Sequence, residues 1–131
     1  MRPHRRLTAA LLVVAVAVPA ACNPLHRRGT ARSDAPPVVI FANQSMAEAA
    51  VYAVSRSGAE SRIGTVQPGR TDTLTVDGAV LGGSGAVTIV ARLLAMPQTP
   101  STGPLTLARG ERIAVTLPPD ARILTVLPAP R

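Results

Sequence analysis

Residues 112–117 read Arg-Ile-Ala-Val-Thr-Leu, and this stretch sets the pattern for most of the chain. Ile113, Val115 and Leu117 alternate with smaller or polar residues, so every second side chain is strongly apolar. Successive side chains of a β-strand point to opposite faces, and this alternation therefore predicts a strand with one buried face. Residues 71–76, Thr-Asp-Thr-Leu-Thr-Val, repeat the pattern. After residue 37 no segment keeps a 3.6-residue apolar period, which disfavours helices there.

The region from residue 38 to residue 127 contains seven or eight short strand-like runs. They are Val38–Asn43, Ala50–Ser55, Ser61–Val66, Thr71–Val76, Ala86–Ala95, Pro104–Leu107, Arg112–Leu117 and Ile123–Leu127. Their near-regular spacing predicts an all-β sandwich of seven to eight mostly antiparallel strands. The more continuously apolar run 86–95 is the predicted central strand, and residues 46–50 are predicted as loop or turn.

Turn-forming residues separate these runs. Ser57-Gly58, Pro68-Gly69, Asp77-Gly78, Arg109-Gly110 and Pro118-Pro119-Asp120 supply preset or positive φ angles, and Gly82–Gly85 is expected to be a flexible connection. Asn43-Gln44-Ser45 is formally a glycosylation sequon. Its side chains also end strands by local hydrogen bonding, and we expect this simpler role.

The strand and turn patterns resemble a known group of proteins. Asn43-Gln44-Ser45, Val51–Val54, Ile63–Val66 before Pro68-Gly69, and Leu107–Leu117 are similar to uncharacterised small bacterial lipoproteins with an immunoglobulin-like or prealbumin-like sandwich. The resemblance covers most of residues 38–118. It implies a sandwich fold and a lipid anchor, and it implies no established activity.

The first 21 residues have the features of a secretory signal peptide. Residues 1–6 contain three arginines, and an apolar run of 15 residues follows from Leu7 to Ala21. A membrane-spanning helix needs about 20 apolar residues, so this run is too short to span a bilayer. We therefore predict a signal peptide over residues 1–21.

Cys22 is the only cysteine, and the residues before it resemble the lipobox of bacterial lipoproteins. Ala20 and Ala21 match the small residues before the cleavage point, whereas Pro19 stands where Leu is usual. The resemblance implies cleavage after Ala21 and acyl chains, palmitate among them, on Cys22. In that family Asn23 is compatible with transport to the outer membrane. The alternative is an ordinary signal peptide cut after Ala20, which would release a secreted or periplasmic protein with an unpaired thiol.

The rest of the chain divides into three parts. Residues 22–37 contain Pro and Gly without apolar periodicity, and we predict a lipidated Cys followed by a flexible tether. The sandwich domain is expected over 38–127 and a C-terminal tail over 128–131. The expected location is the cell envelope, with the lipid anchor in a membrane, most simply the periplasmic face of the outer membrane.

The net charge of +7 lies mostly outside the predicted domain. Residues 38–127 contain seven arginines and six acids, and Phe41 and Tyr52 are their only aromatic residues. Nucleic-acid binders combine a basic face with stacking aromatic rings, so no nucleic-acid partner is expected. Phe41 and Tyr52 are expected to anchor the core, with a ligand-facing patch as the alternative.

Residues 38–127 also lack the side chains that most catalysis requires. His4 and His26 lie in the leader and the tether, so histidine catalysis, thiol nucleophiles and transition-metal sites are not expected in the domain. The six acids (Glu48, Glu60, Asp72, Asp77, Glu111 and Asp120) are scattered, and most flank turns. Ser84 has no GxSxG context, and the glycines around it lack the lysine of a phosphate-binding loop. We therefore expect no catalytic residue, cofactor or metal.

The expected function is that of a non-enzymatic envelope lipoprotein. Its sandwich would bind or help assemble another envelope component, and an exposed sheet edge offers the simplest mechanism. The alternative is a small-ligand module, for a sugar or a peptide, that uses loops 67–70, 77–85 and 96–103 at one end of the sandwich.

Overall fold

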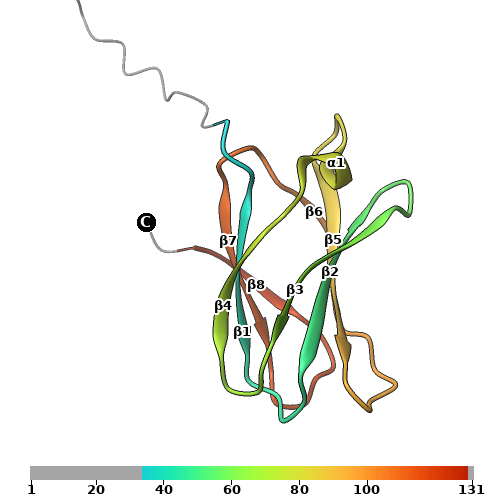
Figure 1. Cartoon of the computed structure of the whole chain (residues 1–131), viewed down its shortest axis with the longest axis vertical. Helices are drawn as coiled ribbons and strands as arrows, with labels where there is room; N and C mark the ends of the chain where they lie inside the picture. Colours follow the sequence, from blue (N-terminus) through green and yellow to red (C-terminus); the bar gives the residue numbers. More distant parts are fainter. Residues whose placement is uncertain (1–33, 130–131) are drawn as a thin grey trace, which may run out of the picture. The chain divides into compact units, whose positions relative to one another are not determined.

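Two four-stranded β-sheets pack face to face in residues 34–129, the part of the chain that the computed structural model describes (Figure 1). The strands are β1 (Val38–Asn43), β2 (Ala49–Ser55), β3 (Glu60–Val66), β4 (Thr71–Thr75), β5 (Ala86–Leu93), β6 (Ser101–Thr106), β7 (Arg112–Leu117) and β8 (Thr125–Pro128), and α1 (Gly78–Leu81) is a single short helix. Sheet A has the order β4-β1-β7-β8, and sheet B has the order β3-β2-β5-β6. The predicted all-β sandwich of mostly antiparallel strands is confirmed.

Alternation along the strands forms the core between the sheets. Sheet A turns Val39, Phe41, Val115 and Leu117 inward, and sheet B turns Val51, Ala53, Ile89 and Ala91 inward; all eight are fully buried. Full burial of one large apolar side chain contributes about 1.5–3 kcal/mol. The alternation of apolar and smaller or polar side chains seen in residues 112–117 therefore accounts for the inner faces of both sheets.

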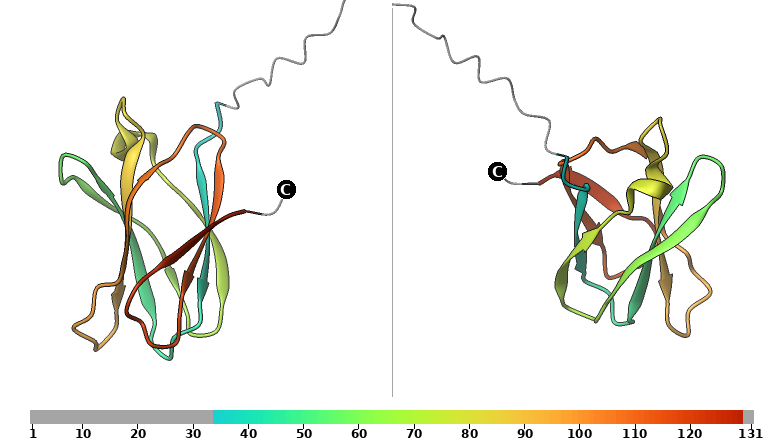
Figure 2. Two further views of the ribbon diagram at one scale, coloured as in Figure 1. Left: turned by 180° about the vertical axis from the view of Figure 1, so that it is seen from behind. Right: turned by 45° about the horizontal axis from the view of Figure 1, so that its top comes forward.

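β1 joins two parts of the chain that are far apart in sequence. It pairs antiparallel with β4 on one side and parallel with β7 on the other (Figure 2). The parallel pair is bordered by hydrogen bonds from Val38 N to Glu111 O and from Gln44 N to Leu117 O, both 2.9 Å. Nothing in the sequence pattern predicted this pairing.

Only β1 and β7 have the predicted bounds: β2 and β3 start one residue earlier than predicted, β4 ends one residue earlier, and β5 ends at Leu93, two residues before the predicted end.

Three further elements differ more. β6 starts at Ser101, before the predicted start at Pro104, because β6 is an edge strand in which a proline removes no hydrogen bond of the sheet. β8 starts later than predicted and ends at Pro128, inside the predicted tail. Residues 78–81, predicted as part of a loop, form α1, whose first turn is capped by Asp77: its side chain accepts a 2.9 Å hydrogen bond from Ala79 N.

The predicted signal peptide, the cleavage point at Ala21, the lipidation site at Cys22 and most of the predicted tether lie outside the described residues. Within residues 34–129, no helix is long and apolar enough to cross a bilayer.

Candidate interaction site

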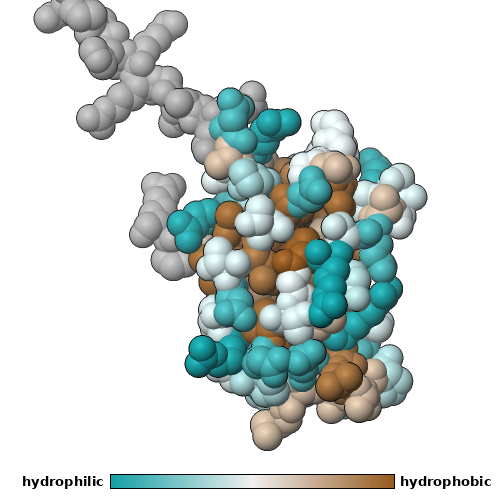
Figure 3. Space-filling model, in the orientation of Figure 1, coloured by the Kyte–Doolittle hydropathy of each residue, from teal (hydrophilic) through white to brown (hydrophobic). Residues whose placement is uncertain are grey.

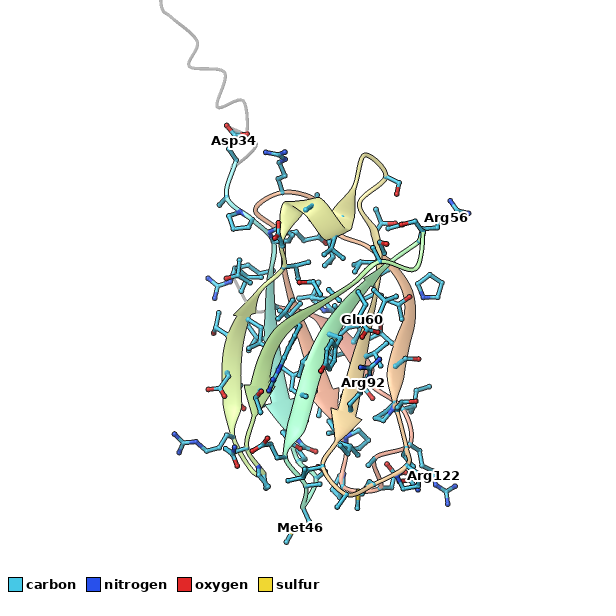
Figure 4. All side chains as sticks on the ribbon, turned by 45° about the vertical axis from the view of Figure 1, so that its right-hand side comes forward. Asp34, Met46, Arg56, Glu60, Arg92 and Arg122 are labelled. Carbon is cyan, nitrogen blue, oxygen red and sulfur yellow. The ribbon has the colours of Figure 1, made fainter. Side chains whose placement is uncertain are left out.

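Four loops lie at the end of the sandwich that is opposite Asp34, the first described residue (Figure 4). They comprise residues 44–48, 67–70, 94–100 and 118–124, and we call them together the distal loop end. Backbone hydrogen bonds hold them to one another and to the adjoining strand ends: Leu94 N to Glu48 O (2.9 Å), Gln44 N to Leu117 O (2.9 Å), Gly69 N to Asn43 O (2.8 Å) and Leu124 N to Ser101 O (3.3 Å). Segments distant in the sequence are thus brought to one end of the domain.

Large apolar side chains are exposed at the distal loop end. Five large hydrophobic residues are exposed in the described part of the chain, and four of them belong to these loops: Met46 (88% exposed), Leu94 (68%), Ile123 (64%) and Met96 (44%). Figure 3 shows apolar surface at this lower end, below a band of hydrophilic side chains. Single exposed apolar residues are ordinary, but their gathering on one end is typical of a binding surface.

The charges of the distal loop end are balanced. Its loops carry two acids, Glu48 and Asp120, and two arginines, Arg70 and Arg122. The Gln67 side chain donates a hydrogen bond to the Glu48 carboxylate, and the Asp120 carboxylate accepts one from Arg122 N at 3.4 Å. The surface is therefore apolar at its tips with no net charge among its loop residues.

A buried polar cluster shapes the loop that presents Met46. The side-chain nitrogen of Asn43, which is fully buried, donates to Ala47 O (2.8 Å) and to Val66 O (2.9 Å). Its side-chain oxygen accepts from Ser45 N (3.0 Å) and from Ser45 Oγ (2.7 Å). The predicted strand-ending role of this motif is confirmed, and burial of Asn43 makes the sequon inaccessible in the folded domain. The bond to Val66 could not be read from the sequence, because Val66 belongs to the other sheet.

The three loops considered for ligand binding do not lie together. Loop 67–70 and the first five residues of the predicted loop 96–103 belong to the distal loop end, and residues 101–103 are part of β6. Loop 77–85 lies at the Asp34 end, where Gly85 N donates to Leu81 O and Gly85 O accepts from Leu107 N. A pocket of about 550 Å³ lies beside that loop, with Asp34 and Arg109 as its charged lining residues. In the described residues no buried side-chain nitrogen or oxygen lacks a hydrogen-bond partner, so no buried polar group is left unpaired beside this pocket.

The two aromatic residues have different environments. Phe41 is fully buried, as predicted, but Tyr52 lies on the outer face of sheet B, because the alternation in β2 turns Val51 and Ala53 inward. The Arg92 guanidinium lies 4.5 Å from the centre of the Tyr52 ring and forms a 2.8 Å ion pair with Glu60 (Figure 4). The prediction that Tyr52 is a core anchor is therefore wrong.

The acids have the local roles expected of turn residues. Asp77 caps α1, and the Glu111 carboxylate accepts a 2.7 Å hydrogen bond from Ala108 N. Within residues 34–129 no three His, Cys, Asp or Glu side chains lie close enough together to hold a metal ion.

The edges of the two sheets differ in regularity. β3 has a register shift opposite Val51 and Tyr52, and β6 has one opposite Thr88–Val90 and contains Pro104. β8 has four residues and ends in a proline. β4 pairs with β1 without a shift over five residues and contains neither Gly nor Pro. Among the four edges of the described domain, β4 is thus the most regular.

These features define a small all-β sandwich protein with an apolar loop surface and one regular open edge. Comparison with protein families found no match, and comparison with curated proteins found none either. Among solved structures, the chain is similar to one described as the NMR structure of the protein from Eubacterium rectale. The identity is 13%, the match covers 73% of this chain and 90% of that chain, and the TM-score is 0.45.

Proposed function

We propose that the chain is a non-enzymatic lipoprotein of the cell envelope, anchored through Cys22, whose sandwich binds another envelope protein through the distal loop end. The observation that carries the proposal is the gathering of Met46, Leu94, Met96 and Ile123 on loops opposite Asp34. A tether that joins the domain at Asp34 would leave this surface free to meet a partner.

The chemistry of the distal loop end favours a protein over a lipid surface. Membrane-docking surfaces are rich in Trp and Tyr at the interface and gain about 1 kcal/mol from each basic residue near anionic lipids. The distal loop end has no aromatic residue, and its two arginines are balanced by two acids. Met46 and Met96 have flexible, polarisable side chains that adapt to a protein surface. The partner is therefore expected to present an apolar patch of its own.

The sandwich is proposed to be prealbumin-like rather than immunoglobulin-like. In an immunoglobulin constant domain the first strand pairs with the second. Here β1 pairs with β4 and β7, and β2 belongs to the other sheet. The strand order therefore supports the prealbumin-like alternative of the two that the sequence resembles.

The anchor is tested by the mass and detergent partitioning of the native protein beside a Cys22→Ser variant. We expect the native protein to be heavier by its acyl chains and to enter the detergent phase, while the variant remains in the aqueous phase. If both proteins remain aqueous and begin at Ala21, the proposed anchor is wrong and the ordinary signal peptide is correct.

The binding surface is tested by photo-crosslinking in the native envelope. A photoreactive residue replaces Met46, Leu94 or Ile123 in the full-length protein, and the matched control replaces Arg56, which lies in the loop between β2 and β3, away from Met46 (Figure 4). We expect the same protein adduct from the three distal positions and none from position 56. Adducts from all four positions, or none from any, would contradict the proposal.

Lipid binding by the same surface is a separate outcome. The Cys22→Ser protein is mixed with phospholipid vesicles, neutral or anionic, and sedimented. We expect it to stay in the supernatant. Sedimentation that is lost on Met46→Ser and Leu94→Ser substitution would replace the protein partner with a membrane.

The small-ligand alternative is favoured by one observation, the pocket of about 550 Å³ beside Gly82–Gly85, which has a volume typical of ligand sites. A fragment screen by NMR tests it, with shifts expected at Ser84 and Arg109 if the pocket binds small molecules. An absence of localised shifts would remove this alternative.

A further inference from the structure

The backbone of β4 presents unpaired groups along the open edge of sheet A. In an antiparallel pair, alternate residues exchange hydrogen bonds with the partner strand, and the residues between them direct N–H and C=O to the other side. Hydrogen bonds from Val76 N to Pro37 O (3.0 Å) and from Asn43 N to Arg70 O (2.8 Å) fix which set faces β1. Asp72 and Leu74 therefore bond to β1.

The other residues of β4, Thr71, Thr73 and Thr75, direct their backbone groups away from the sheet. All three are exposed, and no strand lies beyond β4 in sheet A (Figure 1). Threonine favours extended structure, and the edge has no Pro, Gly or bulge to prevent pairing. β4 therefore offers three consecutive donor and acceptor pairs to another strand.

We propose that β4 pairs antiparallel with β4 of a second copy of this chain, about a two-fold axis at Thr73. The two copies of sheet A would then form one continuous sheet. Thr73 would lie opposite Thr73 of the second copy, and Thr71 opposite Thr75, so that about six backbone hydrogen bonds form. A two-fold interface requires a surface that complements itself, and the Thr-Asp-Thr-Leu-Thr sequence of β4 meets this requirement in that register.

The register centred on Thr73 is favoured over its neighbours. It places threonines opposite threonines on the outer face, a stabilising cross-strand combination. A register centred on Asp72 would set the two Asp72 carboxylates directly opposite each other, which is destabilising. A register centred on Leu74 would leave Thr71 beyond the end of the partner strand.

Asp72 weakens the proposed pairing without preventing it. In the register centred on Thr73, Asp72 faces Leu74 of the second copy, and the two Asp72 residues are diagonal neighbours about 7–8 Å apart. Two negative charges at that distance are only partly screened at physiological salt. With so short a strand and this repulsion, we expect a weak dimer with a Kd on the order of 100 µM.

Sedimentation equilibrium of the purified full-length chain over a wide concentration range tests the proposal. Any association through the N-terminal segment is common to all variants, so the comparison between variants isolates the contribution of the edge. The decisive pair is Thr73→Pro and Thr73→Val. Proline removes an N–H that points away from β1 and so leaves the pairing with β1 intact, whereas valine keeps the N–H and the β-branched shape.

We expect Thr73→Pro to weaken association at least tenfold, Thr73→Val to leave it unchanged, and Asp72→Asn to tighten it about threefold. Amide hydrogen exchange gives a second measurement, because the amides of Thr71, Thr73 and Thr75 should gain protection as the concentration rises. The proposal would be overturned if exchange at these amides did not depend on concentration, or if Thr73→Pro left the dissociation constant of the dimer unchanged. Neither result bears on the distal loop end, which uses other residues.

Discussion

The side-chain nitrogen of Asn43 donates a 2.9 Å hydrogen bond to Val66 O and so connects the end of β1 in sheet A to the end of β3 in sheet B. The same side chain accepts two hydrogen bonds from Ser45. One buried amide thus holds two sheets and one loop of the distal loop end in a fixed relation. Because Asn43 is fully buried, water cannot replace the bonds that its removal would break.

Asn43→Ala is therefore expected to lower the free energy of unfolding by about 2–3 kcal/mol, since it removes the four hydrogen bonds that the Asn43 side chain makes in the interior. Urea denaturation measures the change. The adjacent Gln44→Ala is the control, because Gln44 is exposed, and it should change stability by less than about 0.5 kcal/mol. Similar losses from both substitutions would show that the cluster does not stabilise the fold.

Gly85 is expected to be irreplaceable, unlike its neighbour Gly83. Gly85 has φ +65°, and a Cβ there would lie 2.7 Å from Leu107 O, whereas a Cβ at Gly83 would have no atom within 4 Å. Gly85→Ala should lower the free energy of unfolding by at least about 2 kcal/mol, and Gly83→Ala should be neutral or slightly stabilising. Thermal unfolding of the two variants provides the comparison, and equal effects would contradict the close approach at Gly85.

Leu93 and Leu94 are adjacent in the chain, but Leu93 belongs to the core and Leu94 to the proposed binding surface. Leu93 is 6% exposed and Leu94 is 68% exposed. Leu93→Ala should destabilise the domain by about 2–5 kcal/mol, and Leu94→Ala by less than about 0.5 kcal/mol. If Leu94→Ala also lost several kcal/mol, Leu94 would be a packing residue and would not be available to a partner.

The Arg92–Glu60 ion pair should add little stability. Its side chains are 50% and 38% exposed, and pairs of this kind contribute less than about 1 kcal/mol. A double-mutant cycle with Arg92→Met and Glu60→Gln should give a coupling energy in that range that declines as salt is added. Tyr52 is the sole tyrosine, and no tryptophan is present, so its fluorescence should respond to Arg92→Met but not to the control Arg122→Met. A coupling energy of several kcal/mol would mean that the pair is shielded from solvent.

Local patterns were sufficient to predict the strands that carry strict alternation. β1 and β7 have the predicted bounds, and the predicted central strand lies inside sheet B between β2 and β6. β6 and β8 were displaced because a proline and a short apolar run give weak local signals, and their limits depend on the neighbouring strand. Tyr52 was misplaced because its type suggests the core, although the alternation in β2 already assigned the inner face to Val51 and Ala53.

The distal loop end and the open edge of β4 depend on which strands are neighbours in space, and the order of residues in the sequence does not show this. Met46, Leu94 and Ile123 are separated by many residues, and only the strand directions bring their loops to one end. The open edge of β4 likewise follows from which strand lies beside β1. Neither surface has a motif by which it could be recognised in advance.

The sequence by itself determined that the chain after residue 37 forms an all-β sandwich, because burial of alternate side chains is a local property with a period of two. The same reasoning identified Asn43 as a strand end and the glycine-containing turns as breaks. Only the tertiary structure decided the strand order, the parallel pairing of β1 with β7, and the separation of an apolar loop end from a regular sheet edge. The physical reason is that backbone hydrogen bonds between strands are almost independent of side-chain identity, so the choice of neighbour is settled by how all the inner faces pack together.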